Sequence, residues 1–181
     1  MAIHLTKFRG PRVKNLLPAS TNRARVISAA LAIVVFPASL PAVAEDGLCD
    51  PLLEFVKSVK PGETRALKFN TIMGSNFKDR EGAAKGAKRC EFNSYEPAKT
   101  VCKYLMSFSA SDSSGYNARS AITCLSPKTR FATGTRLHAI SFSTPVGLSA
   151  HPNHVDVVYD DDQELGGMAL TITVNGSQDA G

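Results

Sequence analysis

The chain begins with the pattern of an export leader, and this pattern decides how much of it remains to fold. Residues 1–25 carry six Lys or Arg and no acid, and residues 26–40 form an apolar run. Residues 42–44 (Ala-Val-Ala) place small side chains at the −3 and −1 positions of a signal-peptidase site. This order of basic, apolar and small residues predicts a signal peptide over residues 1–44.

Removal of this leader leaves 137 residues, 45–181, which suffice for one domain that buries roughly two-thirds of the surface of its unfolded chain. The alternative is an uncleaved membrane anchor, since residues 26–44 are about long enough to cross a bilayer, but Pro37 and Pro41 interrupt this stretch. We therefore expect a single exported domain over residues 45–181, with a polar tail at 175–181. It should lie in the periplasm of a bacterium or outside the cell.

The charge of the mature part is almost balanced, unlike that of the whole chain. The formal net charge of +5 arises from 21 Lys and Arg and 16 Asp and Glu, and six of these basic residues lie in the leader. The mature part has a net charge of −1, which argues against a nucleic-acid binder. Residues 45–136 hold 15 basic and 10 acidic residues, whereas residues 137–181 hold six acids and no Lys or Arg. We favour mutual attraction of the two parts, or solvated faces, over two charged poles for a partner.

The four cysteines all lie in the mature part. An even number in an exported chain predicts two disulfides, and the absence of a Cys-x-x-Cys motif argues against a zinc knuckle or a redox pair. We favour Cys49–Cys90 with Cys102–Cys124, because a first helix running back along the first strand brings its start near the second strand. Two neighbouring helices would bring the other two cysteines together. The alternative is Cys49–Cys124 with Cys90–Cys102.

Hydrophobic periodicity predicts an α+β fold. Between residues 94 and 110 the apolar pattern fits a helix or a strand, and we favour the helix because good helix formers dominate it. Val157 and Ile172 belong to two alternating runs that we expect to pair as a hairpin with one buried face. The expected fold is an antiparallel sheet of four to six strands, with two or three helices packed on one face. The other predicted helices cover residues 50–60 and 118–126, the strands cover 64–73, 88–93, 135–143, 155–159 and 168–174, and a loop covers 145–153.

A cationic loop is the candidate for binding. Residues 74–88 are polar and rich in glycine, and they contain no P-loop motif. A solvated loop is the simpler interpretation, but cations on a mobile loop also suit charge-assisted hydrogen bonds to an acidic protein. We therefore expect a non-enzymatic protein of the inhibitor, immunity or envelope adaptor type, without cofactor, nucleic acid or transmembrane span in the mature chain. The cations are Lys78, Arg80, Lys85, Lys88 and Arg89.

The alternative function is a small metal-dependent periplasmic hydrolase. His151, His154 and Asp156 stand at a predicted junction between loop and strand, and imidazole and carboxylate groups are common zinc ligands. No His-Glu-x-x-His helix accompanies them, so a solvated loop is the simpler interpretation. The acidic run 160–164 offers oxygen ligands for calcium but lacks the EF-hand order, and a charged hairpin loop explains it equally well. No Gly-x-Ser-x-Gly motif indicates a serine hydrolase.

Overall fold

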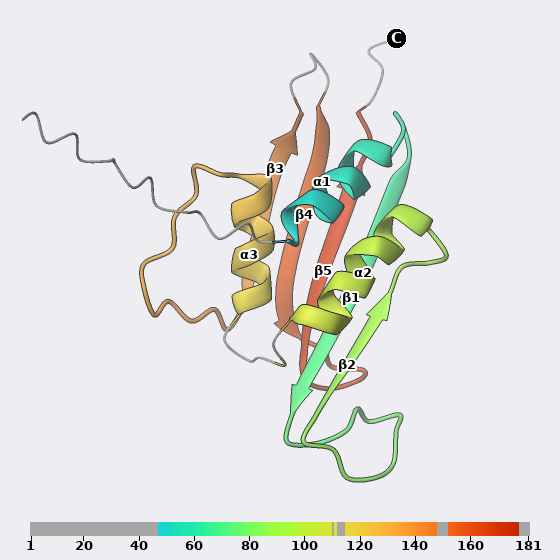
Figure 1. The fold of residues 1–181 in the computed structure, drawn as a ribbon, viewed down its shortest axis with the longest axis vertical. Helices are drawn as coiled ribbons and strands as arrows, with labels where there is room; N and C mark the ends of the chain where they lie inside the picture. Colours follow the sequence, from blue (N-terminus) through green and yellow to red (C-terminus); the bar gives the residue numbers. More distant parts are fainter. Residues whose placement is uncertain (1–46, 110, 112–114, 148–151, 178–181) are drawn as a thin grey trace, which may run out of the picture. The chain divides into compact units, whose positions relative to one another are not determined.

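Five antiparallel strands form one sheet in the order β2-β1-β5-β4-β3, and three helices lie on one face of it (Figure 1). These elements belong to a computed structural model that describes residues 47–109, 111, 115–147 and 152–177. The predicted leader and its cleavage site lie outside the described residues, as does the end of the polar tail. The elements are α1 (Cys49–Ser58), β1 (Thr64–Met73), β2 (Gly86–Glu91), α2 (Glu96–Phe108), α3 (Tyr116–Leu125), β3 (Ile140–Val146), β4 (Asn153–Asp161) and β5 (Met168–Asn175).

The core lies between the sheet and the helices, which confirms the predicted α+β fold. Leu67 and Phe69 of β1 are each 1% exposed on the helix-covered face, and Leu105 of α2 is equally buried. On β1 the side chains of Lys68 and Asn70 alternate with these two and point away from the helices. We call this second side of the sheet the open face.

Helix α2 occupies the segment whose apolar pattern fitted both a helix and a strand. Pro97 stands in its first turn, where the missing N–H of proline has no helical partner to lose. Val101 and Leu105, one turn apart, are buried, whereas Met106 and Phe108 are exposed. Helical spacing therefore decides which side chains reach the core. The prediction is wrong for Phe108, which the same spacing placed on the buried face but which is exposed at the last residue of the helix.

Strands β4 and β5 form the predicted hairpin with the predicted faces. Val157 pairs with Ile172, and both side chains are fully buried. Their neighbours Val158 and Thr171 pair on the open face, where Val158 is 40% exposed. A slip of the pairing by one residue would exchange these two sets, so the alternation in the sequence specifies the register.

Strand β3 is shifted relative to the prediction of 135–143. It begins only at Ile140, and the start of the predicted segment belongs to a turn in which the N–H of Thr135 donates to the carbonyl of Ala132 at 3.1 Å. It also continues through Pro145 into the predicted loop. The strand lies at the edge of the sheet, and an edge strand tolerates a residue that has no N–H.

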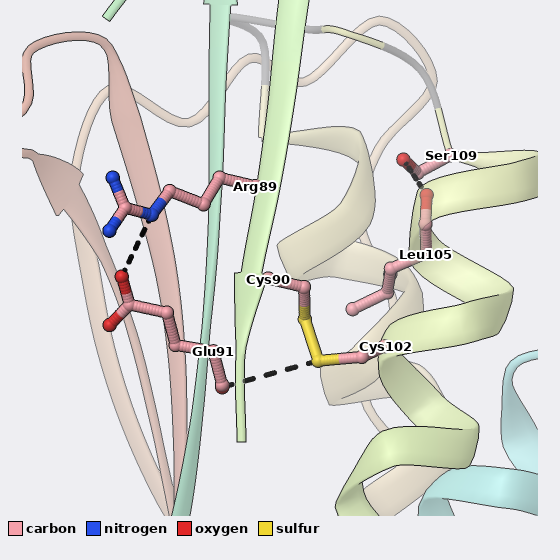
Figure 2. Close-up of a disulfide and its surroundings, with 6 residues drawn as sticks. All are labelled: Arg89, Cys90, Glu91, Cys102, Leu105 and Ser109. Atoms are coloured by element: carbon pink, nitrogen blue, oxygen red, sulfur yellow. Dashed lines mark hydrogen bonds and ion pairs between the residues drawn. A yellow bond between two sulfur atoms is a disulfide. The ribbon is translucent and has the colours of Figure 1, made fainter. Parts of the chain in front are cut away.

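Two disulfides are present, as predicted, but the favoured pairing is wrong and the alternative is observed. Cys49 bonds to Cys124 and Cys90 bonds to Cys102, with Cα–Cα distances of 5.0 and 5.6 Å. Helix α1 contacts α2, α3 and β4 instead of running over β2, so its start meets the end of α3. Helix α2 covers β2, and Figure 2 shows Cys102 facing Cys90 across their interface.

Candidate binding surface

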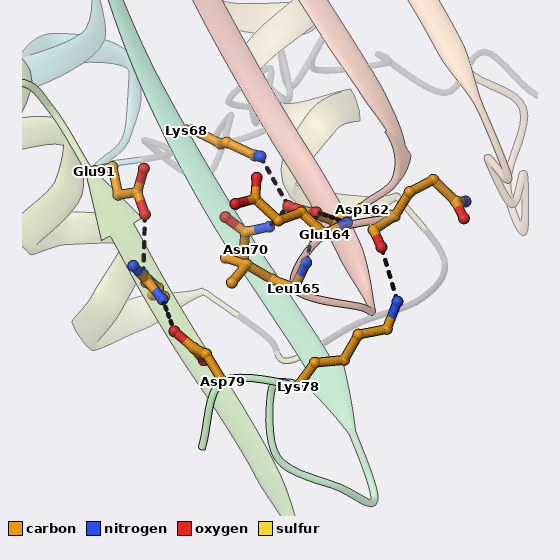
Figure 3. A network of polar contacts seen from close by, with 10 residues as sticks. Lys68, Asn70, Lys78, Asp79, Glu91, Asp162, Glu164 and Leu165 are labelled. Carbon is orange, nitrogen blue, oxygen red and sulfur yellow. Dashed lines mark hydrogen bonds and ion pairs between the residues drawn. The ribbon is translucent and has the colours of Figure 1, made fainter.

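The cationic loop after β1 packs against the turn that joins β4 to β5. The backbone N–H of Lys78 donates to the Leu165 carbonyl at 2.9 Å, and its Nζ donates to the Gln163 carbonyl at 2.7 Å. The neighbouring Phe77 is only 4% exposed, so its ring anchors the loop. Figure 3 shows the Lys78 side chain reaching toward this turn. The loop is therefore held at its middle instead of moving freely along its whole length.

Asp162 holds the turn from inside. It is 7% exposed, and one carboxylate oxygen accepts the backbone N–H groups of Glu164 and Leu165 at 2.9 Å each. The other oxygen accepts Nζ of Lys68 at 2.8 Å and Nδ2 of Asn70 at 2.5 Å (Figure 3). Burial opposes the charged form, but these donors outweigh it and hold the pKa of Asp162 well below its usual range. The hydrogen bond to Asp162 in turn raises the pKa of Lys68.

Three of the five predicted binding cations have partners within the chain. Lys78 bonds to the turn, as described above. Arg89 forms an ion pair with Asp79 at 2.6 Å and a second with Glu91 at 2.9 Å, and the second is drawn in Figure 2. Lys88 points to the helix-covered face, where its Nζ donates to two backbone carbonyls at the end of α2. Lys78 and Arg89 thus hold the loop against the turn and against β2, whereas Lys88, which lies on β2 itself, ties this strand to the end of α2.

Arg80 and Lys85 are the two cations of the set that remain. Both are exposed, and neither side chain has a hydrogen bond or ion pair with any residue that the structure describes. Their backbones are nevertheless fixed, since Arg80 N–H donates to the Phe77 carbonyl at 3.0 Å and the Lys85 carbonyl accepts Gly74 N–H at 3.1 Å. Both cations thus extend into solvent from an ordered backbone.

A hollow of about 350 Å³ lies on the open face beside the same turn. Its lining is acidic, with Asp160, Asp161 and Glu164 around the Lys68–Asp162 ion pair. Within residues 47–109, 111, 115–147 and 152–177, no three His, Cys, Asp or Glu side chains are placed to hold a metal ion. The acidic run 160–164 was the candidate for calcium binding. Its central residue, Asp162, instead points inward and accepts hydrogen bonds from protein donors.

Two of the three predicted metal ligands lie together on the open face of β4. Ser143 Oγ, on β3, donates to Asp156 and lies 3.3 Å from Nδ1 of His154. Asn175, on β5, donates to the other carboxylate oxygen of Asp156 at 3.1 Å. His151 lies outside the described residues. Only the register of three strands brings Ser143 and Asn175 to this cluster, so the sequence analysis missed them.

Helix α2 adds two cations that the sequence analysis did not single out. Lys99 and Lys103 are one helical turn apart and line a second hollow of about 350 Å³, beside the Cys90–Cys102 disulfide. Residues four apart lie on the same side of a helix, and Cys102 lies next to Lys103. The pairing Cys90–Cys102 would therefore have indicated that both lysines lie near β2.

The chain matches no protein-family model, and no curated protein or solved structure is similar enough to indicate a relationship. In the part that the structure describes, no helix has the length and the apolar character needed to cross a membrane.

Proposed function

We propose that the chain is an exported, non-enzymatic binding protein of the inhibitor, immunity or envelope adaptor type, which binds an acidic partner protein through the loop that carries Arg80 and Lys85. The pattern of the leader supports export to the periplasm or the exterior of a bacterium. The two disulfides fit this location, because disulfides form and persist in oxidising compartments.

The observation that carries the proposal is the contrast between the anchored and the free cations. Phe77 and Lys78 hold the loop against the turn, while Arg80 and Lys85 are exposed and have no partner among the described residues. A loop that is ordered before binding loses less conformational entropy when a partner docks. Exposed cations on such a loop steer an acidic partner toward it and then donate charge-assisted hydrogen bonds.

The experiment has two stages. A photo-crosslinking amino acid at the exposed Ala83 captures the partner in the cells that make the protein, and the purified partner is then titrated against defined variants. Arg80→Ser with Lys85→Ser should weaken binding about tenfold or more and flatten its salt dependence. The matched control is Lys128→Ser with Arg136→Ser, since these exposed residues remove the same charge elsewhere. Equal affinities of wild type and the loop variant would contradict the proposal.

A metal-dependent hydrolase remains the second candidate, because His154 and Asp156 lie side by side on the open face with Ser143 between them. Each carboxylate oxygen of Asp156 already accepts one protein donor, so a metal ion there would compete with these hydrogen bonds for the carboxylate. Metal analysis of the purified protein, with His154→Ala as a control, tests it. One zinc per chain, lost in the variant, would favour the hydrolase.

A further inference from the structure

The hollow beside the Cys90–Cys102 disulfide lies between helix α2 and β2, which is the edge strand opposite β3. Cys90 and Phe92 line it from the side of β2, and Lys99, Lys103 and Met106 line it from α2. The disulfide joins its two walls, with 5.6 Å between the Cα atoms (Figure 2). Met106 is 43% exposed, so an apolar surface is open to solvent at this position.

Along the edge of β2 next to this hollow, backbone groups have no strand partner among the described residues. Among the described residues β2 pairs with β1 alone. In an antiparallel pair, every second residue of a strand bonds to its neighbour and the residues between them direct their N–H and C=O groups to the other side. The bond from Gly74 N–H to the Lys85 carbonyl shows which set bonds to β1, and Arg89 belongs to it. The N–H and C=O groups of Lys88 and Cys90 therefore point away from β1. Such an edge accepts an additional strand from a partner, and main-chain hydrogen bonds then supply part of the affinity.

The charge at this edge selects the partner. The lining of the hollow contains two lysines and no acid. Lys103 is exposed, and Lys99 pairs with the exposed Glu96 at 2.8 Å, a surface ion pair that contributes little and exchanges readily. Lys85 stands immediately before β2 on the same edge. A second copy of this chain would bring lysines against lysines, whereas a segment with carboxylates meets complementary charge.

We propose that an extended acidic segment of the partner protein adds to the free edge of β2 and inserts an apolar side chain into the hollow beside the Cys90–Cys102 disulfide. This inference rests on the proposed function and specifies how the partner binds. Alternate side chains of an added strand point to the same side, about 7 Å apart. On the side of α2 the segment should therefore carry an apolar residue with an acid two positions away, near Lys99 or Lys103.

A random decapeptide library displayed on phage tests the inference. Selection on the oxidised mature protein should enrich peptides with an apolar residue and an acid two positions away. In amide NMR spectra, binding should shift the signals of Lys88 and Cys90. The variant Lys99→Ser with Lys103→Ser should bind these peptides about tenfold more weakly than wild type. The control variant, Lys57→Ser with Lys128→Ser, should bind them with unchanged affinity. Circular dichroism should show that all variants fold, since the four lysines lie on the surface.

Three results would overturn the inference: no enriched peptides, enrichment of basic or uncharged ones, or shifts confined to another surface. Failure of this inference can be distinguished from failure of the proposed function. If the peptides fail while the natural partner still depends on Arg80 and Lys85, the edge of β2 is not the docking site and the proposed function stands. If the affinity of the natural partner does not depend on Arg80 and Lys85, the proposed function is wrong regardless of the peptide result.

Discussion

Replacing Asp162 with Ala should destabilise the protein by about 3 kcal/mol. The buried carboxylate accepts four hydrogen bonds, two from the backbone of its own turn and two from Lys68 and Asn70. Removing one partner of a buried ion pair typically costs about 3 to 5 kcal/mol. The Lys68 side chain is 35% exposed and gains water after the change, so the cost should lie near the lower end.

Urea unfolding followed by far-UV circular dichroism measures this cost, since the chain has no Trp to report by fluorescence. The control is Asp160→Ala, an exposed acid of the same hairpin, which should cost about 0.5 kcal/mol or less. Equal costs at the two positions would refute the argument that Asp162 organises the turn.

The stability that Asp162 contributes should also depend on pH. Because the folded protein holds the pKa of Asp162 below its unfolded value, the carboxylate contributes its full stability above about pH 5 and loses it as the pH falls toward the folded pKa. The difference in unfolding free energy between wild type and Asp162→Ala should therefore shrink on acidification. A difference that stays constant from pH 7 to pH 3 would contradict the assigned charge state.

Further predictions concern the core, the crosslinks and the leader. Ile172→Ala should cost about 2 to 5 kcal/mol in urea unfolding, whereas Thr171→Ala on the open face should cost much less. A non-reducing peptide map should show the observed pairs, and loop-closure entropy predicts a loss of about 4.5 kcal/mol without Cys49–Cys124 but only about 3 kcal/mol without Cys90–Cys102. A smaller loss from the longer loop would show that native strain dominates. Mass spectrometry of the exported protein should find Glu45 at its N-terminus, and a retained leader would indicate an anchor.

Much of the fold was predictable because local patterns dictate it. Apolar residues occupy every second position along the centres of β4 and β5, so the faces of Val157 and Ile172 followed directly from the sequence. Val158 and Ala169 nevertheless add apolar side chains on the other face. The disulfide pairing was not predictable in the same way, since it depends on which helix covers which strand. Placing α1 over the middle of the sheet and α2 over β2 reverses the favoured pairing.

The candidate surface was predictable in position but not in detail. Glycine and charge indicated the loop after β1, but no local pattern shows that Lys78 bonds to a turn 85 residues away. The partner of Lys88, at the end of α2, lies 21 residues away and is not visible in a local pattern either. Only the tertiary contacts separate these structural cations from Arg80 and Lys85, which remain available for a partner.

The salt dependence of partner binding tests the central claim most directly. Affinity of the purified, photo-crosslink-identified partner is measured from low to high ionic strength for wild type and for Arg80→Ser with Lys85→Ser. We expect the affinity of wild type to fall steeply with salt, because exposed charges are screened within about 8 to 10 Å at physiological ionic strength. The variant should bind more weakly at low salt, and its affinity should change less with salt. Parallel salt dependences with equal affinities would contradict binding through this loop.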